Sequence, residues 1–211
     1  MPEPIHDIEG FVLAGGASSR MERDKGHLQW GATTFAERAA EALQTIATKP
    51  VVIVGGSGFD QSMGKFRFLP DFKPDDETRR AAIFGLQTIF RNSNATWAAI
   101  LACDLPFADH NLFARLATFR NADFEAVVPV QPDGRWQPLC ALYRGAACLP
   151  QVEAMLTENT WSLKELLNRI RPRFVSWAEI GDLPNSESFF LNVNTPADYS
   201  LALCLKAKDS D

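Results

Sequence analysis

The sequence predicts an α/β fold, with one domain built on a mostly parallel twisted sheet and helices on both faces. Strand-like and helix-like segments alternate along most of the chain. The all-apolar run at residues 51–54 is typical of a strand that is buried on both faces. The length of 211 residues fits a single domain over residues 1–211, and no repeat or linker marks a boundary. We expect about eight N-terminal and about five C-terminal residues to be frayed.

In the first half of the chain, predicted strands and helices alternate regularly. Thr34 and Glu37 have the spacing of a capping box, and apolar residues at helical spacing follow them until Pro50. A further helix is expected over residues 79–91. Strands are expected over residues 8–13, 51–54, 66–69 and 97–102.

The second half continues the pattern. Asp109 is expected to cap a helix that includes Leu112, Phe113, Leu116 and Phe119. Gln131-Pro132-Asp133-Gly134 is a turn signal between strands expected at 124–130 and 138–143. Helices are expected over 146–156 and 162–169, and a last helix is expected to begin at Pro196. Short apolar segments stand at 174–177 and 189–191.

Composition excludes several classes of function. The net charge of -5 argues against a nucleic-acid partner held by non-specific phosphate contacts. No apolar run approaches the roughly 20 residues that cross a bilayer, and the N-terminus lacks the pattern of a signal peptide. The four cysteines contain no C-x-x-C pair and are interpreted as buried thiols of a reducing cytosol: Cys103, Cys140, Cys148 and Cys204. We therefore expect a soluble, cytoplasmic protein without a membrane partner.

A glycine loop after the first strand has the composition of a phosphate cradle. Gly15 and Gly16 can bring main-chain N–H groups close to an anion, and Arg20 and Lys25 can neutralise it. The spacing fits neither a P-loop, which needs Gly-Lys-Ser/Thr, nor the Gly-x-Gly-x-x-Gly fingerprint of dinucleotide-binding folds. The later glycine-rich segment at 55–58 is either a simple turn or a second part of the sheet edge at which ligands bind.

Asp104 is the candidate metal ligand. It stands just past the carboxyl end of an apolar strand, and Pro106 fixes the backbone after it. A carboxylate there can bind Mg²⁺ together with substrate phosphates, although the same sequence also fits a strand that simply ends in a turn. Phosphoryl-group chemistry by positioning and charge stabilisation needs no protein nucleophile. The scattered histidines His6, His27 and His110 argue against a metal hydrolase.

The motifs, taken together and in order, resemble those of the molybdenum cofactor guanylyltransferase family, a family of nucleotidyltransferases with a Rossmann-like fold. They run from residue 11 to about residue 200, and the first and last are specific in combination. They are the Leu13 to Lys25 loop, Cys103-Asp104-Leu105-Pro106, Gln137-Pro138-Leu139-Cys140-Ala141-Leu142-Tyr143, Ser162-Leu163, and Asn192-Val193-Asn194-Thr195-Pro196-Ala197-Asp198.

The resemblance implies transfer of GMP from GTP to the terminal phosphate of molybdopterin that bears molybdenum, with release of pyrophosphate. Mg²⁺ is the implied cofactor, and proteins that mature molybdoenzymes are further implied partners. Arg20, Lys25 and Asp104 would be catalytic, with Asp104 as the metal ligand. The nucleotide would contact Leu13, Ala14, Gly15, Gly16, Lys25, Asp71, Gly85 and Asp104. The pterin substrate would contact Arg135, Gln137, Asn192 and Asn194, and Asn194 could also approach the metal.

Alternatives remain for several of these residues. Asp71 could cap its loop, and Asn192 and Asn194 could be turn residues before the last helix. Arg135 and Trp136 either stack on a flat pterin or stand at a rim without a ligand.

Two departures from the family pattern bear on function: Glu22 replaces a glycine, and residues 81–84 lack the family's Gly-Pro. That segment contributes to base recognition in relatives. The departures motivate two alternatives. One is transfer with another base or acceptor, as in a cytidylyltransferase or a sugar-phosphate nucleotidyltransferase. The other is a degenerate nucleotide-binding or partner-binding subunit without turnover.

Overall fold

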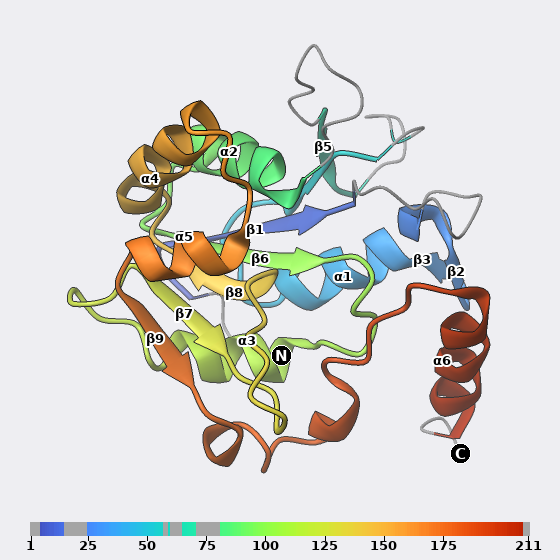
Figure 1. Cartoon of the computed structure of the whole chain (residues 1–211). Coiled ribbons are helices and arrows are strands. Elements are labelled where there is room, and N and C mark those ends of the chain that lie inside the picture. Colours follow the sequence, from blue (N-terminus) through green and yellow to red (C-terminus); the bar gives the residue numbers. More distant parts are fainter. Residues whose placement is uncertain (1–4, 15–24, 57–58, 60–64, 71–80, 209–211) are drawn as a thin grey trace.

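The fold is taken from a computed structural model that describes residues 5–14, 25–56, 59, 65–70 and 81–208 (Figure 1). Its centre is a seven-stranded sheet in the order β5-β4-β1-β6-β8-β7-β9. Each strand pair is parallel except the two pairs that β8 makes, with β6 and β7. The predicted mostly parallel sheet is confirmed. The strands are β1 (Ile8–Leu13), β4 (Val52–Val54), β5 (Arg67–Leu69), β6 (Trp97–Ala102), β7 (Ala126–Pro129), β8 (Cys140–Tyr143) and β9 (Pro172–Val175).

Helices cover both faces of this sheet, as predicted (Figure 1). Side chains alternate along β1, so that Val12 joins the core under one helical layer and Phe11 joins the core under the other. The first layer holds α1 (Phe35–Gln44) and α3 (His110–Ala117). The second holds α2 (Ala82–Asn92), α4 (Gly145–Thr157) and α5 (Leu163–Arg169). No helix in the described ranges is both long and apolar enough to cross a membrane.

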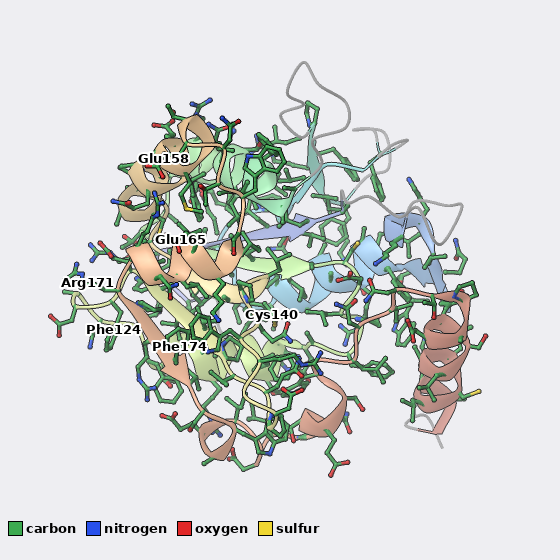
Figure 2. The ribbon with its side chains drawn as sticks, viewed as in Figure 1. Phe124, Cys140, Glu158, Glu165, Arg171 and Phe174 are labelled. Carbon is green, nitrogen blue, oxygen red and sulfur yellow. The ribbon has the colours of Figure 1, made fainter. Side chains whose placement is uncertain are left out.

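Several helix boundaries follow from caps that the sequence predicted. Thr34 and Glu37 form the expected capping box of α1, and the Asp109 carboxylate accepts hydrogen bonds from the backbone N–H groups of the first turn of α3. Ser162 caps α5. Arg169 of α5 donates hydrogen bonds to Glu165 at 3.0 Å and to Glu158 at the end of α4 at 2.7 Å, which joins the two helices (Figure 2).

A small unit outside the main sheet was not predicted. The two-residue strands β2 (Gln29–Trp30) and β3 (Thr33–Thr34) form a hairpin that is too short to give an alternating pattern. The turn between them uses Gly31 at φ +71°. The last helix, α6 (Pro196–Lys208), begins at the predicted proline and packs beside this hairpin (Figure 1).

Some predicted boundaries were wrong. α3 ends at Ala117, so Phe119 lies beyond the helix, where its ring still packs on the core. β7 and β8 are shorter than the predicted strands at 124–130 and 138–143, and beyond them Val130 and Trp136 form only an isolated antiparallel bridge. Cys204 is exposed on α6, whereas the other three cysteines are buried as expected.

A buried carboxylate ties the amino end of β1 to the loop before β6. The Glu9 side chain is 9% exposed and accepts a hydrogen bond from Lys49 Nζ at 2.6 Å. It also accepts from Asn94 N–H at 2.8 Å, from Ser93 Oγ at 3.1 Å and from Ala95 N–H at 3.3 Å. Burial alone would raise the pKa of Glu9, but the hydrogen bonds outweigh burial and hold this pKa below its ordinary value.

We expect Glu9→Gln to lower the free energy of unfolding by about 1–2 kcal/mol at pH 7, because an amide replaces a carboxylate that accepts charged hydrogen bonds. Since the folded pKa is depressed, the stability from Glu9 is present above the unfolded pKa of about 4.3 and is lost as pH falls through the folded pKa. Urea unfolding at several pH values should show a shallower acid slope for Glu9→Gln. The control is Glu153→Gln, which removes the exposed partner of Arg91. Equal acid slopes for Glu9→Gln and wild type, or a loss of unfolding free energy no larger than that of the control, would contradict this role of Glu9.

Candidate active site

The candidate site lies at the carboxyl edge of the sheet between β1 and β6. β1 pairs with β4 on one side and with β6 on the other. The chain passes from β1 outward to β4 and β5 and then crosses back to β6, so the order of the strands reverses beside β1. Such a switch point opens a crevice that binds ligands in α/β sheets. Backbone bonds fix its rim, because Cys103 N–H donates to Leu13 O at 3.0 Å and Ala14 N–H donates to Val54 O at 2.9 Å.

Three segments that are distant in sequence meet at Lys25 in this crevice. Lys25 opens the short 3-10 helix η1 (Lys25–His27), and its ammonium group is 3.1 Å from Asp104 Oδ2 and 2.5 Å from Asn194 Oδ1. The side chains of Lys25 and Asp104 are 17% and 21% exposed. The lysine charge is thus held between a carboxylate and an amide oxygen, partly shielded from water.

The backbone brings Asn194 to this position. Val193 N–H donates to Asp104 O at 2.9 Å, which joins the loop before α6 to the turn after β6. Val193 itself is fully buried, whereas Asn192 and Asn194 on either side are exposed. Alternation along this extended segment therefore presents Asn194 to Lys25. Asn192 shares the loop but has no contact with Lys25 among the interactions that the structure shows for the described residues.

The donor set fits a hard cation. The Asp104 carboxylate and the Asn194 amide oxygen already converge on one compact cation, the Lys25 ammonium. Within the described ranges, no three His, Cys, Asp or Glu side chains gather as a protein-only metal centre. One carboxylate is nevertheless enough for Mg²⁺, which is commonly bound by one or two carboxylates together with waters and substrate phosphates.

Leu13, Ala14 and Gly85 lie at the same edge but are packed inside it. Leu13 and Ala14 are 6% and 3% exposed, and both continue the backbone pairing of β1. Gly85 lies in the first half of α2 directly against Leu13, since a Cβ built on Gly85 would stand 2.5 Å from Leu13 Cδ2. The absence of a side chain at residue 85 lets α2 approach the end of β1.

We expect Gly85→Ala to destabilise the protein by about 1–3 kcal/mol, because the buried Leu13 side chain must move to admit the methyl group. Gly145→Ala is the matched control, since its Cβ would meet Phe90 at an ordinary 3.4 Å. Thermal unfolding of both variants tests the expectation, and equal stability of the two would refute it.

The loop between β7 and β8 lies at the same edge of the sheet. β7 runs parallel to β6, and Ala102 N–H donates to Leu139 O at 2.8 Å, so Gln137 stands near the end of β6. Arg135 reaches into solvent, with a side chain that is 74% exposed and pairs with Asp133. The predicted turn is confirmed by the 2.9 Å hydrogen bond from Gly134 N–H to Gln131 O.

Trp136 is engaged by the protein itself. Its ring stacks on Phe174 of β9 at a centroid distance of 4.4 Å, and Lys164 Nζ lies 5.6 Å from its centroid (Figure 2 labels Phe174). One face of the Trp136 ring is therefore covered by Phe174 rather than free to stack on a flat ligand.

The other predicted residues need separate mention. Gly15, Gly16, Arg20, Glu22 and Asp71 lie outside the described residues. His27 stacks on Phe59 at 4.0 Å, and His110 is the first residue of α3, which agrees with packing and helix positions rather than catalysis. The direct bond from Lys25 to Asn194 was not predicted, although both residues were singled out.

A mostly parallel sheet covered by helices, with Lys25, Asp104 and Asn194 meeting at its switch point, is the architecture of α/β proteins that bind ligands at this edge of the sheet. Residues 10–173 match the model of the MobA-like NTP transferase domain, and the chain belongs to this family of nucleotidyltransferases.

A curated relative agrees with this family, and two solved structures have a similar fold. The chain is 30% identical over 191 residues to a probable molybdenum cofactor guanylyltransferase of Bacillus cereus strain G9842, covering 90% of this chain and 92% of the relative. Molybdopterin-guanine dinucleotide biosynthesis protein A from Archaeoglobus fulgidus has a TM-score of 0.76 at 19% identity, covering 95% and 99% of the two chains. A 2-C-methyl-D-erythritol 4-phosphate cytidylyltransferase from Thermus thermophilus has a TM-score of 0.65 at 16% identity, covering 93% and 98%. The two structural matches show a shared fold.

Proposed function

We propose that this protein transfers GMP from GTP to the terminal phosphate of molybdopterin bearing molybdenum. The products are molybdopterin guanine dinucleotide and pyrophosphate. The observation that carries the proposal is the meeting of Lys25, Asp104 and Asn194 at the switch point. The name of the Bacillus cereus relative, at 30% identity over most of both chains, supports the choice of guanine and pterin.

The reaction is a single displacement at phosphorus. An oxygen of the pterin's terminal phosphate bonds to the α-phosphorus of GTP, and the bond from that phosphorus to the oxygen bridging to the β-phosphate breaks. Lys25 would bind the phosphates and stabilise the charge that moves onto pyrophosphate. Asp104 would hold Mg²⁺, with Asn194 as a second oxygen donor. The metal would supply charge neutralisation for the phosphates when bound.

A covalent enzyme intermediate is not part of the proposal. Cys103, the thiol next to Asp104 in sequence, is 4% exposed. Burial raises the pKa of Cys148 to about 12 and raises that of Cys140 further, so that neither supplies a thiolate at neutral pH. The pterin phosphate, already an anion, is the nucleophile that the reaction needs.

A transferase with another base is the second candidate, because residues 81–84 depart from the family pattern. The packing of Phe84, the bulkiest residue of this segment, bears on the choice of base. Its ring is 7% exposed and lies 6.1 Å from the ring of Trp161, within the core shared by α2 and the segment before α5. The added bulk is therefore absorbed by packing, which favours retention of guanine over a changed base.

Calorimetry with GTP, CTP, UTP and ATP in the presence of Mg²⁺ tests the choice of base. We expect GTP to bind selectively and binding to weaken when EDTA removes the metal. Preference for CTP would overturn the guanine assignment while keeping the class of reaction. Absence of binding by all four nucleotides would favour a degenerate partner-binding subunit without turnover.

A further inference from the structure

The start of α6 is fixed by two residues that hold each other. Asp198 N–H donates to Thr195 Oγ1 at 3.2 Å, and Thr195 N–H donates to Asp198 Oδ2 at 2.8 Å. This reciprocal pair is a capping box with aspartate in the place where glutamate is usual. The same oxygen, Asp198 Oδ2, also accepts from Asn194 N–H at 3.0 Å. Asp198 therefore also holds the backbone of Asn194, the residue that precedes the cap.

That additional bond reaches the candidate site. Asn194 is the residue whose side-chain oxygen contacts Lys25 Nζ, and the preceding Val193 N–H is bound to Asp104 O. The Asn194 backbone is thus held from both sides, by Asp104 through Val193 and by Asp198. A small rotation of the Asn194 backbone would carry its amide oxygen away from the lysine.

α6 is also anchored to the chain segment that follows Lys25. Tyr199 Oη donates to Gln29 O at 2.9 Å, and Lys206 Nζ lies 4.7 Å from the ring centroid of Trp30. Ala202, between these two residues on the helix, is fully buried. The start of α6 is therefore held in place relative to the hairpin after η1. Asp198 in turn holds the Asn194 backbone in place relative to α6.

We propose that Asp198 is a positioning residue of the active site, which orients Lys25 through the backbone and side chain of Asn194 without contacting the reacting atoms. The catalytic consequence rests on the proposed function, whereas the effect on Lys25 does not. A residue that only caps α6 would do no more than stabilise the helix.

Thr195→Ala is the matched control, because it breaks the same capping box from the other side and leaves the bond from Asn194 N–H intact. We expect Asp198→Ala to lower kcat/KM about 10- to 100-fold through misplacement of the lysine. Thr195→Ala should lower it less than about threefold. In an Asn194→Ala background, Asp198→Ala should have an effect below about twofold, since two residues that act through one contact are not additive.

Lysine labelling gives a readout that does not depend on turnover. An amine-reactive acylating reagent, with mass spectrometry of the peptides, measures the rate at Lys25 relative to Lys65, whose side chain is 67% exposed. Asp198→Ala should speed labelling of Lys25 severalfold, and Thr195→Ala should not. If wild-type protein neither binds GTP nor turns over, the proposed function fails while this comparison still tests Asp198.

Two results would overturn the proposal: equal effects of Asp198→Ala and Thr195→Ala on both readouts, or an undiminished effect of Asp198→Ala in the Asn194→Ala background. Circular dichroism checks that the variants are folded. If Asp198→Ala does not fold, Asp198→Glu replaces it, because glutamate keeps the cap while its longer side chain moves the carboxylate away from Asn194 N–H. Full activity and wild-type labelling of Asp198→Glu would then contradict the proposal.

Discussion

Asp104→Ala and Asp104→Asn are expected to lower kcat by about 10²–10³-fold or more while the protein stays folded. Among the described residues, the Asp104 side chain is the carboxylate that contacts Lys25, and in our proposal it is the charged ligand for Mg²⁺. Stability should change by no more than about 1 kcal/mol, because the ion pair is partly exposed. The bond that joins this turn to Val193 uses Asp104 O, which both variants keep.

Asp182→Asn is the matched control for this prediction. Asp182 is also a paired aspartate, with hydrogen bonds to Arg115 at 2.9 Å, but it lies in the loop after β9. We expect its kcat to equal that of the wild type. Turnover should be measured over a range of Mg²⁺ concentrations, since a weakened metal site would show partial recovery at high Mg²⁺. Wild-type turnover by Asp104→Ala would refute the metal assignment.

Lys25→Gln should lower kcat/KM by about 10²–10³-fold, because it removes the cation that in our proposal binds the substrate phosphates. Steady-state kinetics should show loss in kcat as well as a raised KM for GTP. Lys65→Gln, which removes a lysine paired with Glu41 at 3.4 Å, is the control and should leave both constants unchanged.

The double variant of Lys25 and Asp104 adds a test of their coupling. Residues that act as a unit give effects well below the sum of their separate losses. We therefore expect the double variant to be about as impaired as the worse single variant. A fully additive loss would mean that the two side chains act independently, despite the 3.1 Å between them.

Much of the fold could be predicted because local signals agreed with tertiary structure. β1 and β6 have the predicted bounds, since β6 is a continuous apolar run and β1 ends in the apolar residues 11–13, and each is followed by a turn or loop. The caps of α1, α3 and α5 were readable because a side chain and a backbone N–H three residues apart decide them.

The antiparallel direction of β8 was not predicted, because strand direction depends on long-range pairing rather than on composition. The β2–β3 hairpin was also missed, because each of its strands has only two residues.

The candidate site was predicted in its residues but not in its contacts. Lys25 and Asn194 are 169 residues apart, so only the folded chain shows that they touch. The burial of the Phe84 ring could not be predicted either, because its packing on Trp161 depends on how α2 lies against the loop before α5. The Thr195 to Asp198 spacing of a capping box was present in the sequence, and it could have singled out Asp198.

Identification of the reaction product tests the central claim most directly. The protein is incubated with Mg²⁺, molybdenum-bearing molybdopterin and either GTP or CTP, and the products are separated and identified by mass spectrometry. We expect molybdopterin guanine dinucleotide and one pyrophosphate for each GTP consumed, with little product from CTP. A cytosine dinucleotide as the main product, or no dinucleotide from either nucleotide, would contradict it.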